Sequence, residues 1–196
     1  LENAGIEKGD KIAICGRNSA HWTVTYLAVI TYGAVAVPIL HEFKADQVHN
    51  IVNHSEARLL FVGDQIWENL NETAMPHLEG IVELKDFGVP VSRSEKLTYA
   101  RDHLNEIFGH KFPCRFRPDD VSYEKEKSED LAIINYTSGT TGYSKGVMLP
   151  YRSILSNVLY CKEKIGLKAG DSVVSMLPLG PVSYTHLRAH ETGAYL

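Results

Sequence analysis

The sequence predicts an α/β fold in which a mostly parallel β-sheet is flanked by helices. Short apolar runs alternate along the chain with segments whose apolar residues recur at helical spacing. Gly-Asp pairs and prolines separate these segments, as is typical of turns. Strands that alternate with helices form largely parallel sheets, because each helix returns the chain to the edge where the previous strand began.

The apolar pattern places seven strands and five helices along the chain. Strands are expected at residues 11–15, 34–39, 57–62, 81–84, 131–136, 147–149 and 172–176. Helices are expected at residues 20–33, 45–52, 66–75 and 99–108, and after Pro150. Ser19 is suited to cap the first helix, and Pro150 is suited to the first position of the last one. A right-handed crossover through the first helix makes the first two strands parallel.

The pattern also predicts which side chains are buried and which face solvent. Residues 119–130 include six acidic residues and two lysines, so we expect a solvated connector there. His41, His49 and His54 lie in a polar region and are expected to face solvent. The buried face of the last helix is expected to consist of Ile154, Leu155, Val158, Leu159 and Ile165.

Composition indicates an ordinary globular protein. Of 196 residues, 44% are hydrophobic and 22% are charged. The net charge of −4 gives no indication of a nucleic-acid partner. The longest apolar stretch, residues 27–40, is interrupted by polar residues and a proline and is shorter than a membrane span. The first residues lack an initiator Met and a signal-peptide pattern, so we expect the sequence to start inside a longer chain.

The three cysteines predict a reducing environment. Cys15, Cys114 and Cys161 are odd in number, widely spaced and without a C-x-x-C pair, which is typical of free thiols in a cytoplasmic protein. Cys15 follows a predicted strand, but no helper residue for a nucleophile is identifiable nearby. Free cysteines are usually small buried hydrophobes, so we expect Cys15 to pack in the core.

Residues 136–146, which we call the glycine loop, carry the strongest functional signal. The loop reads Tyr136-Thr137-Ser138-Gly139-Thr140-Thr141-Gly142-Tyr143-Ser144-Lys145-Gly146 and lies between two apolar runs. Glycines allow the backbone to approach a ligand closely. Successive main-chain N–H groups then form an anion-binding concavity, which hydroxyls and a lysine can complete. The loop therefore predicts a polyphosphate site, although a Gly/Ser/Thr cluster between apolar runs is also compatible with a plain connecting loop.

The spacing in the glycine loop excludes the two common nucleotide motifs. Four residues after Gly139 the chain reads Ser144-Lys145-Gly146, whereas the Walker loop requires Gly-Lys followed by Ser or Thr. The G-x-G-x-x-G dinucleotide pattern is absent from the loop as well. The stretch instead resembles the signature of the adenylate-forming (AMP-binding) superfamily, which includes acyl-CoA synthetases, luciferases and peptide-synthetase adenylation domains. Ser144 replaces the proline of that signature, and this change removes no ligand group.

Other stretches extend the resemblance over residues 1–179. Residues 5–22 are similar to the early Gly-Asp, strand, Asn-Ser and aromatic segment of the superfamily, and residues 33–38 to its Gly-Ala-Val-x-Val-Pro step. Residues 177–179 are similar to the opening of the next motif, but Gly180-Pro181 then replaces the expected small residue and histidine. We therefore expect residues 1–180 to be part of the large N-terminal AMP-binding domain. Residues 181–196 resemble translated sequencing-adapter sequence, and we expect this tail to be non-native.

The resemblance implies an acid–thiol ligase of which this chain is a fragment. Such enzymes activate a carboxylic acid with ATP as an acyl-adenylate and pass the acyl group to a thiol, usually that of coenzyme A. The implied nucleotide-binding residues are Thr137, Ser138, Gly139, Thr140, Thr141, Gly142 and Lys145, with Thr140 also reaching Mg²⁺. The catalytic residues of the superfamily are expected downstream of this chain, so the fragment alone is expected to be inactive.

The residues after the glycine loop favour a long-chain fatty acid–CoA ligase within the superfamily. The lead-out of the loop and the helix with Arg152, Ser153 and Asn157 carry this resemblance. The expected substrate is a fatty acid or another carboxylic acid, and the whole enzyme is compatible with peripheral membrane contact.

Two alternatives to the CoA ligase stay open from the sequence. The first is an adenylation domain of a carrier-protein or peptide-synthetase system, and the second is a non-enzymatic nucleotide-binding module. A zinc site at His186 and His190 is not expected, because their order differs from His-Glu-x-x-His and no third ligand is evident.

Overall fold

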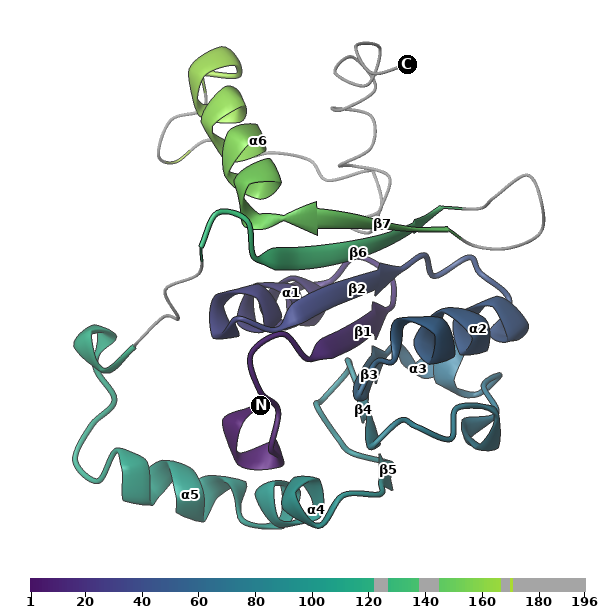
Figure 1. The fold of residues 1–196 in the computed structure, drawn as a ribbon. Coiled ribbons are helices and arrows are strands. Elements are labelled where there is room, and N and C mark those ends of the chain that lie inside the picture. The colour runs from purple at the N-terminus through teal and green to yellow at the C-terminus, as the bar shows by residue number, and fades with distance from the viewer. Residues whose placement is uncertain (122–126, 138–144, 167–169, 171–196) are drawn as a thin grey trace.

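The strands that the structure describes form one seven-stranded sheet in the order β5-β4-β3-β1-β2-β6-β7 (Figure 1). The structure is a computed structural model, and it describes residues 1–121, 127–137, 145–166 and 170. The strands are β1 (Lys11–Cys15), β2 (Val35–Ile39), β3 (Leu59–Val62), β4 (Gly80–Glu83), β5 (Val91–Ser92), β6 (Leu131–Thr137) and β7 (Lys145–Pro150). The five central strands are parallel, and the edge strands β5 and β7 are antiparallel to their neighbours. The predicted mostly parallel α/β fold is confirmed.

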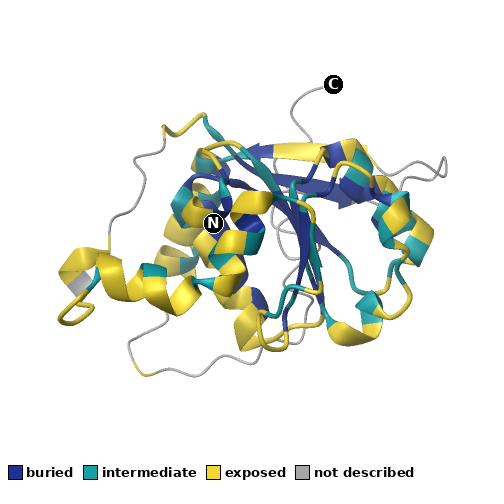
Figure 2. Ribbon diagram, turned by 90° about the horizontal axis from the view of Figure 1, so that it is seen from below, coloured by how far each residue is buried: buried dark blue, intermediate teal, exposed yellow. Residues whose placement is uncertain are grey.

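Helices cover both faces of the sheet. The helices are α1 (Ala20–Tyr32), α2 (Ala45–Ser55), α3 (Asp64–Trp67), α4 (Glu95–Asp102), α5 (Leu104–Lys111) and α6 (Tyr151–Lys164), and three short 3-10 turns lie at Glu2–Ala4, Glu72–Ala74 and Pro118–Asp120. Ile12 and Ile14 pack with α1 on one face, while Ala13 and Cys15 pack with α2 on the other. The central strands are largely dark blue in Figure 2, whereas the outer helix faces and most of β7 are yellow. Burial on both faces explains why the strands are continuous apolar runs.

Local sequence signals explain the first strand–helix–strand unit. The Ser19 hydroxyl accepts a hydrogen bond from the Trp22 N–H at 3.0 Å, which confirms the predicted N-cap of α1. Gly33 ends the helix with φ 86°, a left-handed conformation that glycine adopts without a steric penalty. β1 and β2 pair in parallel as expected. Pro38 lies inside β2 opposite Ile14 and does not end the strand.

The helix predicted at residues 66–75 is wrong. The structure has the short helix α3 and then a 3-10 turn at Glu72–Ala74. The Asn71 side-chain oxygen accepts hydrogen bonds from the N–H and the hydroxyl of Thr73, at 3.0 and 2.7 Å. Such a local bond competes with the helical pattern, and apolar spacing does not reveal it.

The helix predicted at residues 99–108 is two helices, α4 and α5, and the strand β5 was missed. The chain departs from helical geometry at His103, where φ is −119° and ψ is 19°. Its Nδ1 donates to the carbonyl of Tyr99 at 3.1 Å. β5 is two residues long and pairs only at the sheet edge, so it carries too little apolar pattern to be predicted.

The buried face predicted for α6 is wrong for most of its residues. Among the described residues, the start of the helix is attached to the rest of the fold: the Tyr151 hydroxyl donates to the Ile30 carbonyl of α1 at 2.5 Å, and Ile154 packs against the core. α6 then extends away from the sheet (Figure 1). The side chains of Leu155, Val158, Leu159 and Ile165 are 55–58% exposed. The apolar pattern exists, but within the described residues it has no partner surface. The strand predicted at residues 172–176 lies outside the described residues.

Candidate functional site

Between β1 and β3, the side of the sheet to which the chain next connects changes. The connection from β1 leads to β2 on one side, whereas the connection from its other neighbour, β3, leads to β4 on the opposite side. Helices that leave adjacent strands in opposite directions open a crevice at the carboxyl ends of those strands. In open α/β sheets, ligands bind at this point. The topology therefore predicts a site just beyond Cys15 and Val62.

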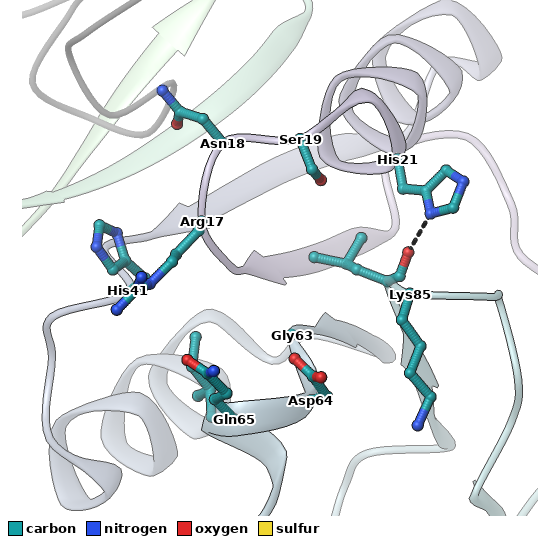
Figure 3. A pocket seen from close by; sticks show the side chains of 11 residues that line it. Arg17, Asn18, Ser19, His21, His41, Gly63, Asp64, Gln65 and Lys85 are labelled. Atoms are coloured by element: carbon teal, nitrogen blue, oxygen red, sulfur yellow. Dashed lines mark hydrogen bonds between the residues drawn. The ribbon is translucent and has the colours of Figure 1, made fainter.

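A cavity of about 460 Å³ lies at this point (Figure 3). Its walls are the turns that follow β1, β2, β3 and β4. The lining residues are Arg17, Asn18, Ser19, His21, His41, Gly63, Asp64, Gln65, Ile66, Leu84 and Lys85. Sequence reasoning did not find this cavity, because its walls come from four separate segments of the chain.

Two glycines, Gly16 and Gly63, bring the carboxyl ends of β1 and β3 close together beside the cavity, which Gly63 lines. The Gly63 N–H donates to the Cys15 carbonyl at 2.9 Å. A Cβ atom added to Gly16 would lie 2.6 Å from Cδ1 of Leu84, and one added to Gly63 would lie 3.7 Å from the Cα of Gly16. Residue 16 therefore has no room for a side chain unless Leu84 moves.

The cavity lining includes two cations, Arg17 and Lys85, one carboxylate, Asp64, and two histidines, His21 and His41. Arg17 and His41 lie at one side in the view of Figure 3, and Lys85 lies at the other. Lys85 pairs with Glu83 at 3.1 Å, and this hydrogen bond raises the pKa of the Lys85 amine. His21 donates from Nδ1 to the Leu84 carbonyl at 2.6 Å, which leaves its Nε2 as the acceptor in the neutral ring. A polar cavity with two cations and one carboxylate has a small excess of positive charge, which favours an anionic ligand.

The stem of the glycine loop lies at the same edge of the sheet. Thr137 ends β6 and pairs with Lys145 at the start of β7, and Tyr136 pairs with Gly146. We call these two pairs the loop stem. The stem lies at the carboxyl end of β6. Because β2 separates β6 from β1, the axes of β6 and β1 are about 10 Å apart. Of the predicted nucleotide-binding residues, Ser138, Gly139, Thr140, Thr141 and Gly142 lie outside the described residues.

The prediction that three histidines simply face solvent is incomplete. His41 follows β2 in a turn, is half-buried and lines the cavity. His49 accepts a hydrogen bond at Nε2 from the Asn71 N–H at 3.0 Å. His54 is exposed, but its Nδ1 lies 2.6 Å from the hydroxyl of Tyr136. This last contact joins residues 82 positions apart, so no local pattern could have indicated it.

Cys15 packs in the core, as predicted. It has no exposed surface, and its thiol lies 3.9 Å from the Leu40 carbonyl. Burial raises the pKa of Cys15 from 9.0 to about 12. The thiol is therefore protonated at neutral pH and is not a nucleophile.

The raised pKa of Cys15 predicts a loss of stability in alkali. Between pH 9.0 and about 12 the unfolded chain loses the thiol proton while the folded chain keeps it, so the free energy of unfolding falls as the pH rises. We expect the thermal midpoint to decline less steeply over this range in Cys15→Ala than in the wild type. Cys114 is exposed, so Cys114→Ala should keep the wild-type slope. Equal slopes in all three proteins would contradict the assignment.

The described part of the chain contains neither a cluster of metal-ligating side chains nor a membrane-spanning helix. There, no group of three His, Cys, Asp or Glu side chains is arranged to hold a metal ion. Thr140, the residue predicted to reach Mg²⁺, and the pair His186 and His190 lie outside that part. No helix within it is both long and apolar enough to cross a bilayer.

Known proteins share both the sequence pattern and the fold. A family model described as AMP-binding enzyme matches residues 1–183. A peroxisomal long chain acyl-CoA synthetase from Arabidopsis thaliana is 30% identical over 192 residues, which cover 93% of this chain and 26% of that protein. A chloroplastic long-chain-fatty-acid–acyl-carrier-protein ligase from the same plant is 29% identical over 192 residues, which cover 91% and 26%.

A solved structure supports the same relationship. The crystal structure of a long-chain-fatty-acid–CoA ligase from Archaeoglobus fulgidus superposes with a TM-score of 0.70 at 26% identity, over 95% of this chain and 34% of that one. The chain spans about a quarter of the length of the curated relatives it matches. Because the family model covers nearly the whole sequence, the chain belongs to the AMP-binding enzyme family.

Proposed function

We propose that this chain is the N-terminal part of an ATP-dependent acid–thiol ligase that acts on long-chain fatty acids. The observation that carries the proposal is the glycine loop, whose stem joins β6 to β7 at the carboxyl edge of the sheet. The similarity of the chain to long-chain acyl-CoA synthetases supports the substrate class. The relatives are about four times longer, so the remaining catalytic groups are proposed to lie downstream.

The proposed reaction has two steps, adenylation of the acid and transfer of the acyl group to a thiol. A carboxylate oxygen of the acid attacks the α-phosphorus of ATP, the bond from that phosphorus to the bridging oxygen breaks, and pyrophosphate leaves with the electron pair. The thiolate of coenzyme A then attacks the acyl carbon, and AMP leaves. Both steps depend on positioning and on neutralising charge more than on a protein nucleophile.

The loop residues are proposed to bind the phosphates. Main-chain N–H groups and hydroxyls of residues 137–142 (Thr137, Ser138, Gly139, Thr140, Thr141 and Gly142) would hold the β- and γ-phosphates. Lys145 would add positive charge to the leaving pyrophosphate, and its position as the first residue of β7 places it at the base of the loop. Thr140 is proposed to reach Mg²⁺, which neutralises phosphate charge when bound. Arg17 and Lys85 add cations at the same edge, which favours anionic substrates.

The thiol acceptor is the finer part of the proposal. Coenzyme A is our first choice, and a carrier protein is the second because one relative of nearly equal identity is named as an acyl-carrier-protein ligase. The complete enzyme, incubated with ATP, a fatty acid and each acceptor in turn, should form acyl-CoA. Product only on the carrier protein would favour the alternative. A cytoplasmic location and peripheral membrane contact remain predictions from the sequence.

Carboxylate-dependent exchange between ATP and labelled pyrophosphate tests the activity itself. We expect the complete enzyme to incorporate label into ATP when a fatty acid is present and not when it is omitted, because only the first step returns pyrophosphate to ATP. A series of fatty acids of increasing length gives the preferred substrate. If no acid in the series supports exchange, the ligase proposal is wrong and a nucleotide-binding module without activity is favoured.

A further inference from the structure

We propose that His54 is a positioning residue for the stem of the glycine loop, which it holds through Tyr136. The proposal rests on the function proposed above, because it assumes that the loop binds ATP. Neither residue belongs to the predicted nucleotide-binding set. Three features carry the proposal: the contact itself, the firm attachment of α2, and the position of the Tyr136 ring over Gly146 in the loop stem.

The contact between His54 and Tyr136 is close and directional. His54 Nδ1 lies 2.6 Å from the Tyr136 hydroxyl, and the two rings meet edge-on with centroids 5.6 Å apart and an interplanar angle of 89°. The Tyr136 side chain is buried, with 2% of its surface exposed. Burial raises the pKa of Tyr136, so its hydroxyl keeps its proton and can donate to the imidazole.

The described backbone pairing between β2 and β6 lies before the loop stem. Along the β2–β6 ladder, Ala36 pairs with Ile133, which lies three residues before Tyr136. Pro38, farther along β2 toward the loop, has no N–H to donate. On the other side, β7 is the last of the described strands, and Met148 is 67% exposed. Within the described residues, the buried Tyr136 side chain joins the stem to the apolar cluster that contains α2.

The helix at the other end of the contact is firmly anchored. Val48, Ile51 and Val52 of α2 are buried against the sheet, with at most 2% of each side chain exposed. Tyr136 packs in the same apolar cluster as these residues. His54 lies in the last turn of α2 and is itself exposed, so its ring fills no space in the core. Its contribution is therefore the hydrogen bond rather than packing.

A displacement of Tyr136 would be transmitted directly to the loop. The Tyr136 ring lies over Gly146, because a Cβ atom added there would be 3.1 Å from Cζ of the ring. The adjacent pair of the stem joins Thr137 to Lys145, which are both predicted phosphate ligands. A hydrogen bond that fixes Tyr136 thus fixes the backbone from which the loop begins and to which it returns.

The test is steady-state ATP–pyrophosphate exchange by the complete enzyme with His54 and Tyr136 variants. His54→Ala should raise the KM for ATP about fivefold with kcat nearly unchanged, because one hydrogen bond of ordinary strength contributes a factor of this size to binding. Tyr136→Phe, which keeps the ring over Gly146, should have the same effect. The double variant should resemble either single variant, since both remove one interaction.

Two further variants separate positioning from a structural role. His54→Asn places an amide near the position of Nδ1 and should restore most of the affinity for ATP. His49→Ala removes a histidine hydrogen bond from the same helix, but that bond goes to Asn71 and not to the loop stem. It should leave the KM for ATP unchanged even if it lowers the thermal midpoint.

The outcomes distinguish this inference from the function on which it rests. Exchange by the wild type with an unchanged KM in His54→Ala overturns the positioning role and leaves the ligase proposal in place. An equal rise in KM in His49→Ala, or no recovery in His54→Asn, also overturns it, because a general loosening of α2 would then be the cause. No exchange by the wild type overturns both proposals.

Discussion

Replacing Lys145 with alanine is expected to lower ATP–pyrophosphate exchange by at least about a hundredfold, the loss typical of removing one preorganised charge or donor from a transition state. Lys145 is the first residue of β7, it is exposed, and it pairs across the loop stem with Thr137. In the proposed mechanism its ammonium stabilises the charge on the departing pyrophosphate. The fold should not change, because an exposed side chain at a sheet edge leaves no cavity when it is shortened.

The controls for Lys145→Ala test charge and position separately. Lys164→Ala removes an exposed lysine from the last turn of α6 and should keep the wild-type rate. Lys145→Arg retains the charge on a differently shaped group and should recover part of the rate. Exchange rates of the complete enzyme at saturating fatty acid, with circular dichroism as a check of folding, measure the effect. A wild-type rate in Lys145→Ala would remove this residue from the mechanism.

Gly146→Val is expected to damage both stability and function. A Cβ atom at this position would lie 3.0 Å from Cγ2 of Ile134 and 3.1 Å from Cζ of Tyr136, and valine adds two methyl groups beyond it. The Tyr136 ring must then move, which breaks its contact with His54. Overpacking of this kind costs about 1–3 kcal/mol in the free energy of unfolding. We also expect the KM for ATP to rise more than in His54→Ala.

Urea unfolding of the chain and exchange by the complete enzyme measure these two effects. Met148→Val is the matched control, since it introduces the same side chain into the same strand at a position that is 67% exposed. Its unfolding midpoint should stay close to that of the wild type. If Gly146→Val unfolds at the wild-type urea concentration, the Tyr136 ring does not limit the space at residue 146.

Local patterns predicted most of the elements near the site. Ser19 capped α1 as expected, and β1 was predicted with its exact bounds. These successes depend on interactions within a few residues, such as a side chain that bonds to the next turn. Predictions were wrong where a short-range bond interrupted the pattern, as at Asn71, or where an apolar face is exposed among the described residues, as at Leu155.

The sequence by itself determined the α/β class and most of the strands and helices in chain order, and it carries the glycine loop from which phosphate binding is predicted. Those features follow from periodicity, capping and residue chemistry, which act locally. Only the tertiary structure decided the strand order, the cavity between Arg17 and Lys85, and the contact of His54 with Tyr136. Each of these joins segments that are far apart in the chain, and their pairing depends on how the whole sheet buries its two faces rather than on any single stretch.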